Sequence, residues 1–203
     1  NLLSTFQETF YLTLNYFNSP NKRIYYLYII SSFFIALVVF YSKKRKTSLF
    51  EYFFSKKIWL SQSAFVDYSL LFFNSLIKLV FIAPLLIFSL KIAFYTNEFL
   101  LDRFNYPSFS ISKKLMMVIY TITVFIMVDL FSYLVHFLQH KVPFLWRFHK
   151  VHHSATTLNP FTQYRIHPIE LIMNNLKAIV VNGLLIGVFD FLAGGRISVY
   201  LFL

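Results

Sequence analysis

The sequence predicts an all-α fold: an integral membrane helical bundle with a cytosol-facing cluster of histidines. Hydrophobic residues make up 58% of the 203 residues and the mean hydropathy is +0.61, above the usual range of soluble domains. The apolar residues form long runs with few charges, which is typical of helices that cross a bilayer. All six histidines gather at or after the end of the third of these runs, within residues 129–170.

The first predicted span covers residues 24–41, an uncharged run rich in Ile, Phe and Tyr. It has about the length that a tilted helix needs to cross a hydrocarbon core of about 30 Å. The mixed polar and aromatic residues 1–20 predict an interfacial or loosely ordered lead-in. The basic residues 43–46 close the span, and the amphipathic segment 48–68 is expected to lie along the lipid head groups.

The second predicted span covers residues 69–95 and contains Lys78 and Pro84. A lysine inside the bilayer needs a cavity or a partner, and proline interrupts helical hydrogen bonding. We therefore expect one kinked crossing here, although a tight hairpin is the alternative. Residues 96–114 are polar and predict an exposed loop, and residues 115–137 predict a third span that carries the first two histidines at its far end.

The fourth predicted span covers residues 171–192, and another apolar run starts at residues 197–203. The chain begins with Asn1 and stops inside that run, so we expect it to be a fragment of a longer protein. We expect residues 1–203 to form a single integral membrane domain, since repeats, low-complexity tracts and internal linkers are absent from the sequence.

The distribution of basic residues predicts the orientation. With residues 69–95 crossing once, ten Lys and Arg residues lie on the histidine side and six on the opposite side, which favours histidines on the cytoplasmic face. The net charge of +11 is thereby explained by topology and lipid contacts, and we expect no nucleic-acid partner.

Four polar residues share one face of the third span. His136 and His140 are four residues apart, so their imidazoles lie about a turn apart and can share one metal ion or serve adjacent ions. Asp129 and Tyr133 continue the same stripe at i, i+4, i+7 and i+11. A carboxylate and a phenol there could orient imidazoles or hold a bound oxygen species.

A second group of histidines follows Pro143, which should end the third span's helix. A short helical segment over residues 144–153 would place His149, His152 and His153 at i, i+3 and i+4, on one face. The two faces together supply five nitrogen ligands without a thiolate. This set suits iron, zinc, manganese or copper better than calcium or magnesium.

Other polar and aromatic residues near the histidines have simpler interpretations. His167 is either a further ligand or a structural residue, and Glu170 could pair with Arg165 at the membrane edge. Trp146 and Tyr164 are expected to be interfacial anchors. Asp129 could be a buried hydrogen-bonding group, yet an ionisable residue in an apolar span is by default a candidate functional residue.

Three motifs in this region resemble those of the membrane-bound fatty acid hydroxylase and sterol desaturase superfamily: HxxxH at His136 and His140, HxxHH ending at His153, and RxHPxE at residues 165–170. The resemblance is specific over residues 129–170 and architectural elsewhere. It implies a helical membrane enzyme with two metal ions, normally iron, that activates O2 to hydroxylate or desaturate a lipid.

The resemblance carries the metal-ligand role to His136, His140, His149, His152 and His153. It also implies a second HxxHH motif downstream, which this sequence lacks. We therefore expect the remaining ligands to lie beyond Leu203, and this chain alone has too few for a full site of two metals. Electrons should come from an external carrier protein, since the four glycines form no nucleotide-binding motif.

Other functions remain as alternatives to an oxygenase. A non-enzymatic metal-binding or metal-transport protein would place ligands near mid-membrane, whereas here five of the six histidines fall at or beyond the end of a span. A haem carrier needs fewer histidines. Zinc proteolysis is disfavoured because HExxH and its reversed form are absent from the sequence, and the lack of cysteine excludes thiolate metal sites.

Overall fold

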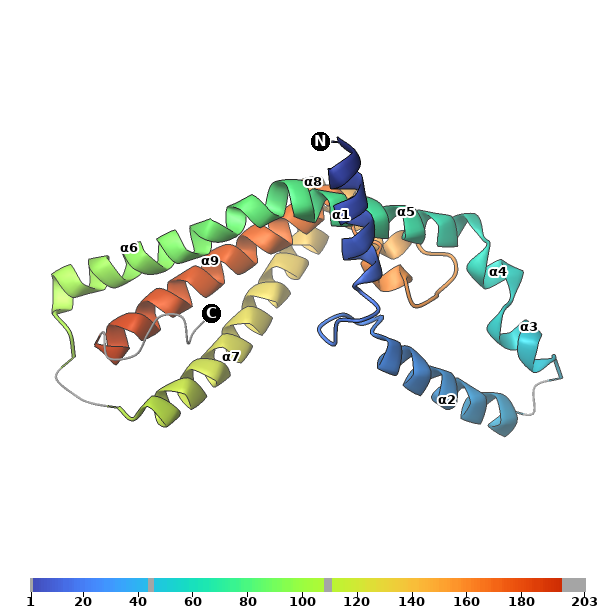
Figure 1. The fold of residues 1–203 in the computed structure, drawn as a ribbon, viewed down its shortest axis with the longest axis horizontal. Helices are drawn as coiled ribbons and strands as arrows, with labels where there is room; N and C mark the ends of the chain where they lie inside the picture. The colour runs from blue at the N-terminus through green and yellow to red at the C-terminus, as the bar shows by residue number, and fades with distance from the viewer. Residues whose placement is uncertain (1, 44–45, 108–110, 195–203) are drawn as a thin grey trace. The chain divides into compact units, whose positions relative to one another are not determined.

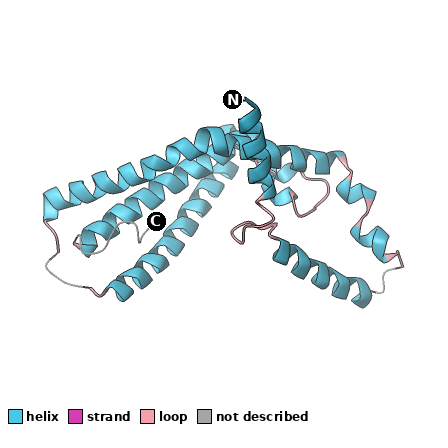
Figure 2. Ribbon diagram, viewed as in Figure 1, coloured by secondary structure: helices cyan, strands magenta, loops and turns pink. Residues whose placement is uncertain are grey.

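The computed structural model describes residues 2–43, 46–107 and 111–194. These residues form helices joined by loops and turns, and no strand occurs among them (Figure 2), which confirms the all-α prediction. Their contacts divide the chain into two compact units, Asn1–Leu79 with Arg147–Pro168, and Val80–Trp146 with Ile169–Leu203. They are unit 1 and unit 2, respectively.

Unit 1 is built around α5 (Gln62–Ile77), against which α1 (Leu2–Leu14) and a short 3-10 turn, η4 (Thr162–Tyr164), pack (Figure 1). Its buried apolar core joins Tyr16, Ile24 and Leu71 from three separate segments. The turn η4, almost a hundred residues after α5 in sequence, packs directly on it. This contact fixes the position of the chain segment that follows His149, His152 and His153.

The apolar run at residues 24–41 forms α2 (Tyr26–Ser42). This 17-residue helix is shorter than the three long apolar helices of the chain, so its crossing of the membrane stays a prediction. The predicted amphipathic segment after it is divided into α3 (Leu49–Phe53), α4 (Lys56–Trp59) and the start of α5. Ser48 and Ser61 accept hydrogen bonds from the first turns of α3 and α5 and so fix where these helices begin. Lys44 and Arg45 lie outside the described residues.

The predicted kinked span at residues 69–95 lies inside a longer helical run, Gln62–Phe104. Its hydrogen-bonding pattern changes to a π-helix over Lys78–Ile82 and to a 3-10 helix over Ala83–Leu86, before α6 (Ile87–Phe104) resumes. Pro84 explains the change, because its ring nitrogen cannot donate and its ring crowds the preceding turn. The sequence located this irregularity correctly but placed both ends of the helix too far inward.

Lys78, at the start of the irregular segment, has a partner within unit 1. Its ammonium donates to the hydroxyl of Tyr16 at 2.6 Å and lies 5.2 Å from the centre of the same ring. A hydroxyl acceptor and a cation–π contact together offset part of the cost of placing a lysine in an apolar run.

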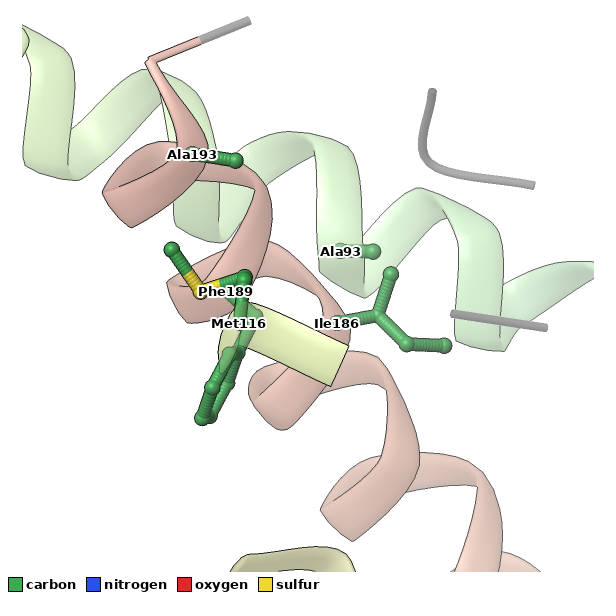
Figure 3. Packing of buried hydrophobic residues seen from close by; sticks show 5 residues of the cluster. All are labelled: Ala93, Met116, Ile186, Phe189 and Ala193. Atoms are coloured by element: carbon green, nitrogen blue, oxygen red, sulfur yellow. The ribbon is translucent and has the colours of Figure 1, made fainter. Parts of the chain in front are cut away.

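Unit 2 consists of α6, α7 (Lys113–Lys141) and α9 (Pro168–Ala193), which lie side by side in Figure 1. Ala93 of α6, Met116 of α7 and three α9 residues, Ile186, Phe189 and Ala193, form its buried cluster (Figure 3). The α6–α9 contact is close: a Cβ added at Gly183 would lie 2.8 Å from the Ser89 carbonyl oxygen. Glycines four residues apart allow this approach of two helix backbones.

Three helices are long and apolar enough to cross a membrane: Gln62–Phe104, Lys113–Lys141 and Pro168–Ala193. The last two contain the predicted spans at 115–137 and 171–192. The apolar run at 197–203 lies outside the described residues, and a single membrane domain and a cytoplasmic histidine face stay predictions.

Candidate metal centre

The first pair of histidines lies on the last turns of α7, in unit 2. The Nε2 atoms of His136 and His140 are 3.2 Å apart, and their ring centres are 4.7 Å apart. Both side chains are exposed on this helix. Trp146 was expected to be an interfacial anchor, and in unit 2 its ring lies 5.3 Å from that of His140, so it also supports the imidazole.

The second group lies in unit 1, after the proline that separates two helices. As predicted, α7 ends just before Pro143, and a short helix, α8 (Pro143–His149), follows. The predicted helical segment at 144–153 is interrupted, because His152 and His153 lie in a separate 3-10 turn, η3 (His152–Ser154). The turn still brings two imidazoles together: the Nε2 atoms of His149 and His153 are 3.1 Å apart, and His149 is buried.

Both Nε2 separations fit two ligands on one metal ion. Two nitrogens at about 2.1 Å from an ion, at angles of about 90–110°, lie about 3.0–3.4 Å apart. The same separation also fits a direct N–H···N hydrogen bond, so one pair alone would not require a metal. Two such pairs within eighteen residues of sequence, both aimed through Nε2, favour the metal interpretation.

His152 is oriented by the backbone. Its Nδ1 lies 3.3 Å from the carbonyl oxygen of Arg165. A carbonyl can only accept, so Nδ1 carries the proton and donates it, which leaves Nε2 with its lone pair available for a metal. Metal-binding histidines are commonly held in this way through their second nitrogen.

The residue that supplies this carbonyl is anchored by a buried ion pair, which the sequence analysis did not find. Arg165 Nε donates to Asp67 Oδ1 of α5 at 2.5 Å, and both side chains are almost inaccessible to solvent. One interpretation paired Glu170 with Arg165 at the membrane edge. The ion pair of Arg165 uses instead a carboxylate from the segment predicted to lie at the lipid surface. Glu170 is itself buried, as the second residue after the start of α9.

The remaining oxygen of Asp67 and the terminal nitrogens of Arg165 have further partners. The second oxygen of Asp67 accepts from Asn159 Nδ2 at 3.1 Å and from the hydroxyl of Thr162 at 2.8 Å. The Arg165 guanidinium also donates to the backbone carbonyl of Ser63 and, at 2.7 Å, to its hydroxyl. A buried pair with this much hydrogen bonding holds the loop after the histidines rigidly on α5.

A sequence signal for Asp67 existed. It is the only acidic residue between Glu51 and Glu98, and Arg165 is the only Lys or Arg between Lys150 and Lys177. Two isolated opposite charges in apolar surroundings are candidates for pairing. Nothing in the local spacing, however, says which isolated charge meets which.

His167 lies beside Phe148 in unit 1, with 5.0 Å between ring centres. Partial burial lowers the pKa of His167 below its usual value of 6.5. The neutral imidazole, which is the form that binds metals, is therefore favoured at neutral pH. A ligand role for His167 stays a prediction.

Asp129 and Tyr133 lie on the exposed surface of α7, one to two turns before His136. Because α7 is unbroken from Lys113 to Lys141, the predicted stripe with His136 and His140 holds geometrically. Tyr133 stacks on Phe137, with 6.2 Å between ring centres, on the same exposed surface. A role for either residue in orienting the imidazoles stays a prediction.

Tyr164, also expected to be an interfacial anchor, is instead part of the core of unit 1. Its hydroxyl accepts from the backbone N–H of Arg23 at 3.0 Å, and its ring meets Tyr16 edge to face. Burial raises the pKa of the Tyr164 phenol, and hydrogen bonds from the backbone at residues 23 and 24 oppose that effect.

A comparison with protein families bears directly on this region. Residues 121–202 match the family model for fatty acid hydroxylases. This part of the chain is therefore similar to fatty acid hydroxylase domains, consistent with the fatty acid hydroxylase and sterol desaturase superfamily that the motifs resemble. No curated protein and no solved structure matches the chain.

The matched residues contain α7 from Thr121 onward, all six histidines and α9. The family is generally one of lipid hydroxylases and desaturases that depend on iron. Together with the three long apolar helices, the match indicates an integral membrane protein. Asp67 lies outside the matched residues, so the ion pair with Arg165 links the matched region to the part of the chain that precedes it.

Proposed function

We propose that this protein is an O2-dependent lipid hydroxylase or desaturase with a histidine-ligated dinuclear iron centre. The observation that carries the proposal is the pairing of imidazole nitrogens in two places within the region that matches fatty acid hydroxylases, at 3.2 Å in α7 and at 3.1 Å between α8 and η3. Neutral imidazoles suit iron, and zinc or another divalent metal could bind in its place.

Six histidines are the proposed ligands. Within unit 2 they are His136 and His140, and within unit 1 His149 is the buried member of the second group. His152 and His153 complete the five, and His167 is a sixth candidate. When bound, the iron supplies O2 activation for the oxidation of a C–H bond of the lipid.

The chain's own residues have definable parts in this proposal. The Arg165 carbonyl holds the proton of His152 on Nδ1, so that Nε2 stays free to bind. The exposed apolar surface of α7 beside His136, which includes Phe137 and Leu134, allows a membrane lipid to approach from the side. Asp129 and Tyr133, on the same face of α7, are the candidates for orienting the imidazoles of His136 and His140. A separate carrier protein on the cytoplasmic side supplies the electrons.

The ligand assignment is tested by the metal content of the intact protein, purified from cells grown with iron. We expect bound iron in the parent protein and much less in His149→Ala and His153→Ala. Lys150→Ala is the matched control, since Lys150 is exposed in the same segment and cannot replace an imidazole ligand. Unchanged iron in both histidine variants would refute these ligands.

The reaction is tested separately by supplying O2, a reductant system and membrane lipids, and by searching for hydroxylated or newly unsaturated products by mass spectrometry. Oxidised products that disappear in His149→Ala support the oxygenase. Tightly bound metal without O2-dependent oxidation under any donor system would instead support a non-enzymatic metal-binding protein.

A further inference from the structure

Unit 1 contains a cleft of about 530 Å³ that none of the histidines lines. Three groups of residues surround it. The first is a stripe of α2, the second is the end of α3 with α4, and the third is the loop before η4 together with the chain that leads into α2. Its lining includes Arg23, Ile29, Phe33, Ala36, Phe53 and Gln163. Sites for small ligands commonly have volumes of roughly 300–1,000 Å³.

The walls of the cleft are fixed by contacts within unit 1. Trp59 Nε1 donates to the Phe53 carbonyl oxygen at 2.6 Å, which joins α4 to the end of α3. The rings of Phe33 and Phe53 lie 4.4 Å apart, so α2 and α3 meet at the edge of the cleft. The cleft is therefore a formed cavity between packed elements.

The apolar part of the cleft is elongated along α2. Ile29, Phe33 and Ala36 are spaced at i, i+4 and i+7, so they follow one face of the helix, and the small side chain of Ala36 leaves room at its end. The opposite wall is aromatic. Such a lining fits one acyl chain running parallel to α2.

The other end of the cleft is basic. Arg23 is exposed at the N-terminal end of the apolar helix α2, and no acidic residue lines the cleft. Its backbone N–H donates to Tyr164, which fixes the position of the residue and leaves the guanidinium to reach a ligand. Lys22, the preceding residue, does not line the cleft, since its ammonium lies 5.0 Å from the centre of the Tyr16 ring. Gln163 Nε2 donates to the Pro160 carbonyl oxygen at 2.7 Å, and its side-chain oxygen can accept a hydrogen bond from a ligand.

From this arrangement we propose that the cleft binds an anionic phospholipid of the bilayer, with the phosphate at Arg23 and one acyl chain along Ile29, Phe33 and Ala36. Guanidinium groups bind phosphate oxygens through charged hydrogen bonds, and basic residues at the end of an apolar helix attract anionic lipids. None of the histidines lines this site, so its test is independent of the oxygenase proposal.

The test is photo-crosslinking of the intact protein in phosphatidylcholine nanodiscs. The probes are phosphatidylglycerol and phosphatidylcholine, each with a diazirine in one acyl chain, and adducts are mapped by mass spectrometry. We expect phosphatidylglycerol to label peptides that contain residues 29–36 or 53–59. Arg23→Gln should lower that labelling about fivefold, which is the effect of one basic residue near an anionic head group.

Two further variants keep the result interpretable. Lys57→Gln removes a cation from α4 that does not line the cleft, and it should label like the parent protein. Ala36→Phe fills the apolar end and should reduce labelling by both lipids, while iron content stays unchanged. Equal labelling by the two lipids, or adducts that persist in Ala36→Phe, would overturn the proposal.

Discussion

Arg165 and Asp67 form a buried ion pair with 2.5 Å between Nε and Oδ1, although 98 positions separate them in the chain. One partner stands thirteen residues after His152 and the other lies on α5. Because the Arg165 carbonyl also accepts a hydrogen bond from Nδ1–H of His152, this pair connects a candidate metal ligand to the core of unit 1.

The first prediction concerns the stability of this pair. Asp67→Asn keeps the shape of the side chain but leaves the Arg165 guanidinium buried without a counter-charge. Breaking a buried pair from one side costs about 3–5 kcal/mol, so the variant should unfold at a clearly lower temperature in detergent. Asp102→Asn, at an exposed carboxylate of α6, is the control and should behave like the parent protein.

A double variant sharpens that prediction. Replacing both partners, by Asp67→Leu with Arg165→Met, removes both charges and so should cost less than Asp67→Asn alone. A double variant that is less stable than the single one would show that the hydrogen bonds around the pair, and not its unpaired charge, dominate the loss.

The second prediction concerns metal affinity. If the ion pair positions His152, then Asp67→Asn should weaken iron binding by roughly 10–100-fold, as loss of an outer partner of a ligand commonly does. Gly187→Ala, which disturbs unit 2 without touching this network, is the control for general destabilisation. Equal loss of iron in the two variants would contradict a positioning role for Asp67.

The sequence predicted the helical class, the long helices at 115–137 and 171–192, and the helix break after His140, because each depends on local features. Uncharged runs of sufficient length become helices, and Pro143 cannot continue the helix that precedes it. The pairing of His136 with His140 follows in the same way from spacing on one helix.

The remaining features depend on contacts between distant segments, which local patterns do not determine. Asp67 lies in an amphipathic stretch, where an acidic residue is expected at the surface. Its ion pair with Arg165, from a distant segment, explains its burial. The positions of Lys78 and Tyr164 were predicted from the hydrophobicity of their surroundings. Their hydrogen-bond partners, Tyr16 and the backbone of Arg23, come from the N-terminal segment. Tertiary packing decided each of these positions.

The third prediction concerns a lysine inside α9. Lys177 Nζ donates to the hydroxyl of Ser132 on α7 at 2.8 Å. Ser132 lies four residues before His136 on the same helix. Ser132→Ala removes the acceptor, and a polar group left without one costs about 1–3 kcal/mol. Lys177→Met in the same protein should restore part of that loss, because it removes the donor as well.

The control for this pair is Thr121→Ala, which removes an α7 hydroxyl that donates to the carbonyl of Met117 in its own helix. Unfolding temperatures of the four proteins in one detergent give the comparison. If Lys177→Met makes Ser132→Ala still less stable, the Lys177–Ser132 hydrogen bond is not the reason for the loss.

The fourth prediction concerns pH. Burial holds the pKa of His167 below 6.5 in the folded protein, so the unfolded chain binds a proton more readily. Above pH 6.5, His167 is neutral in both the folded and the unfolded protein and does not lower the free energy of unfolding. As the pH falls below 6.5 towards the lower pKa of the folded state, protonation favours the unfolded chain and the free energy of unfolding decreases. Metal-free His167→Asn should therefore show a shallower drop in unfolding temperature below about pH 6.5. An unchanged slope would assign the pH dependence to other groups.

The fifth prediction concerns the close approach of α6 and α9. A Cβ at Gly187 would collide with the Ala93 carbonyl oxygen and lie 2.6 Å from the Thr96 Cβ. Backbone cannot move aside as a flexible side chain can, so Gly187→Ala should cost about 1–3 kcal/mol. Gly187→Leu should cost more. Leu184→Phe adds bulk to an exposed position of the same helix and should be tolerated. Equal unfolding temperatures for Gly187→Leu and Leu184→Phe would mean that this contact does not hold α6 against α9.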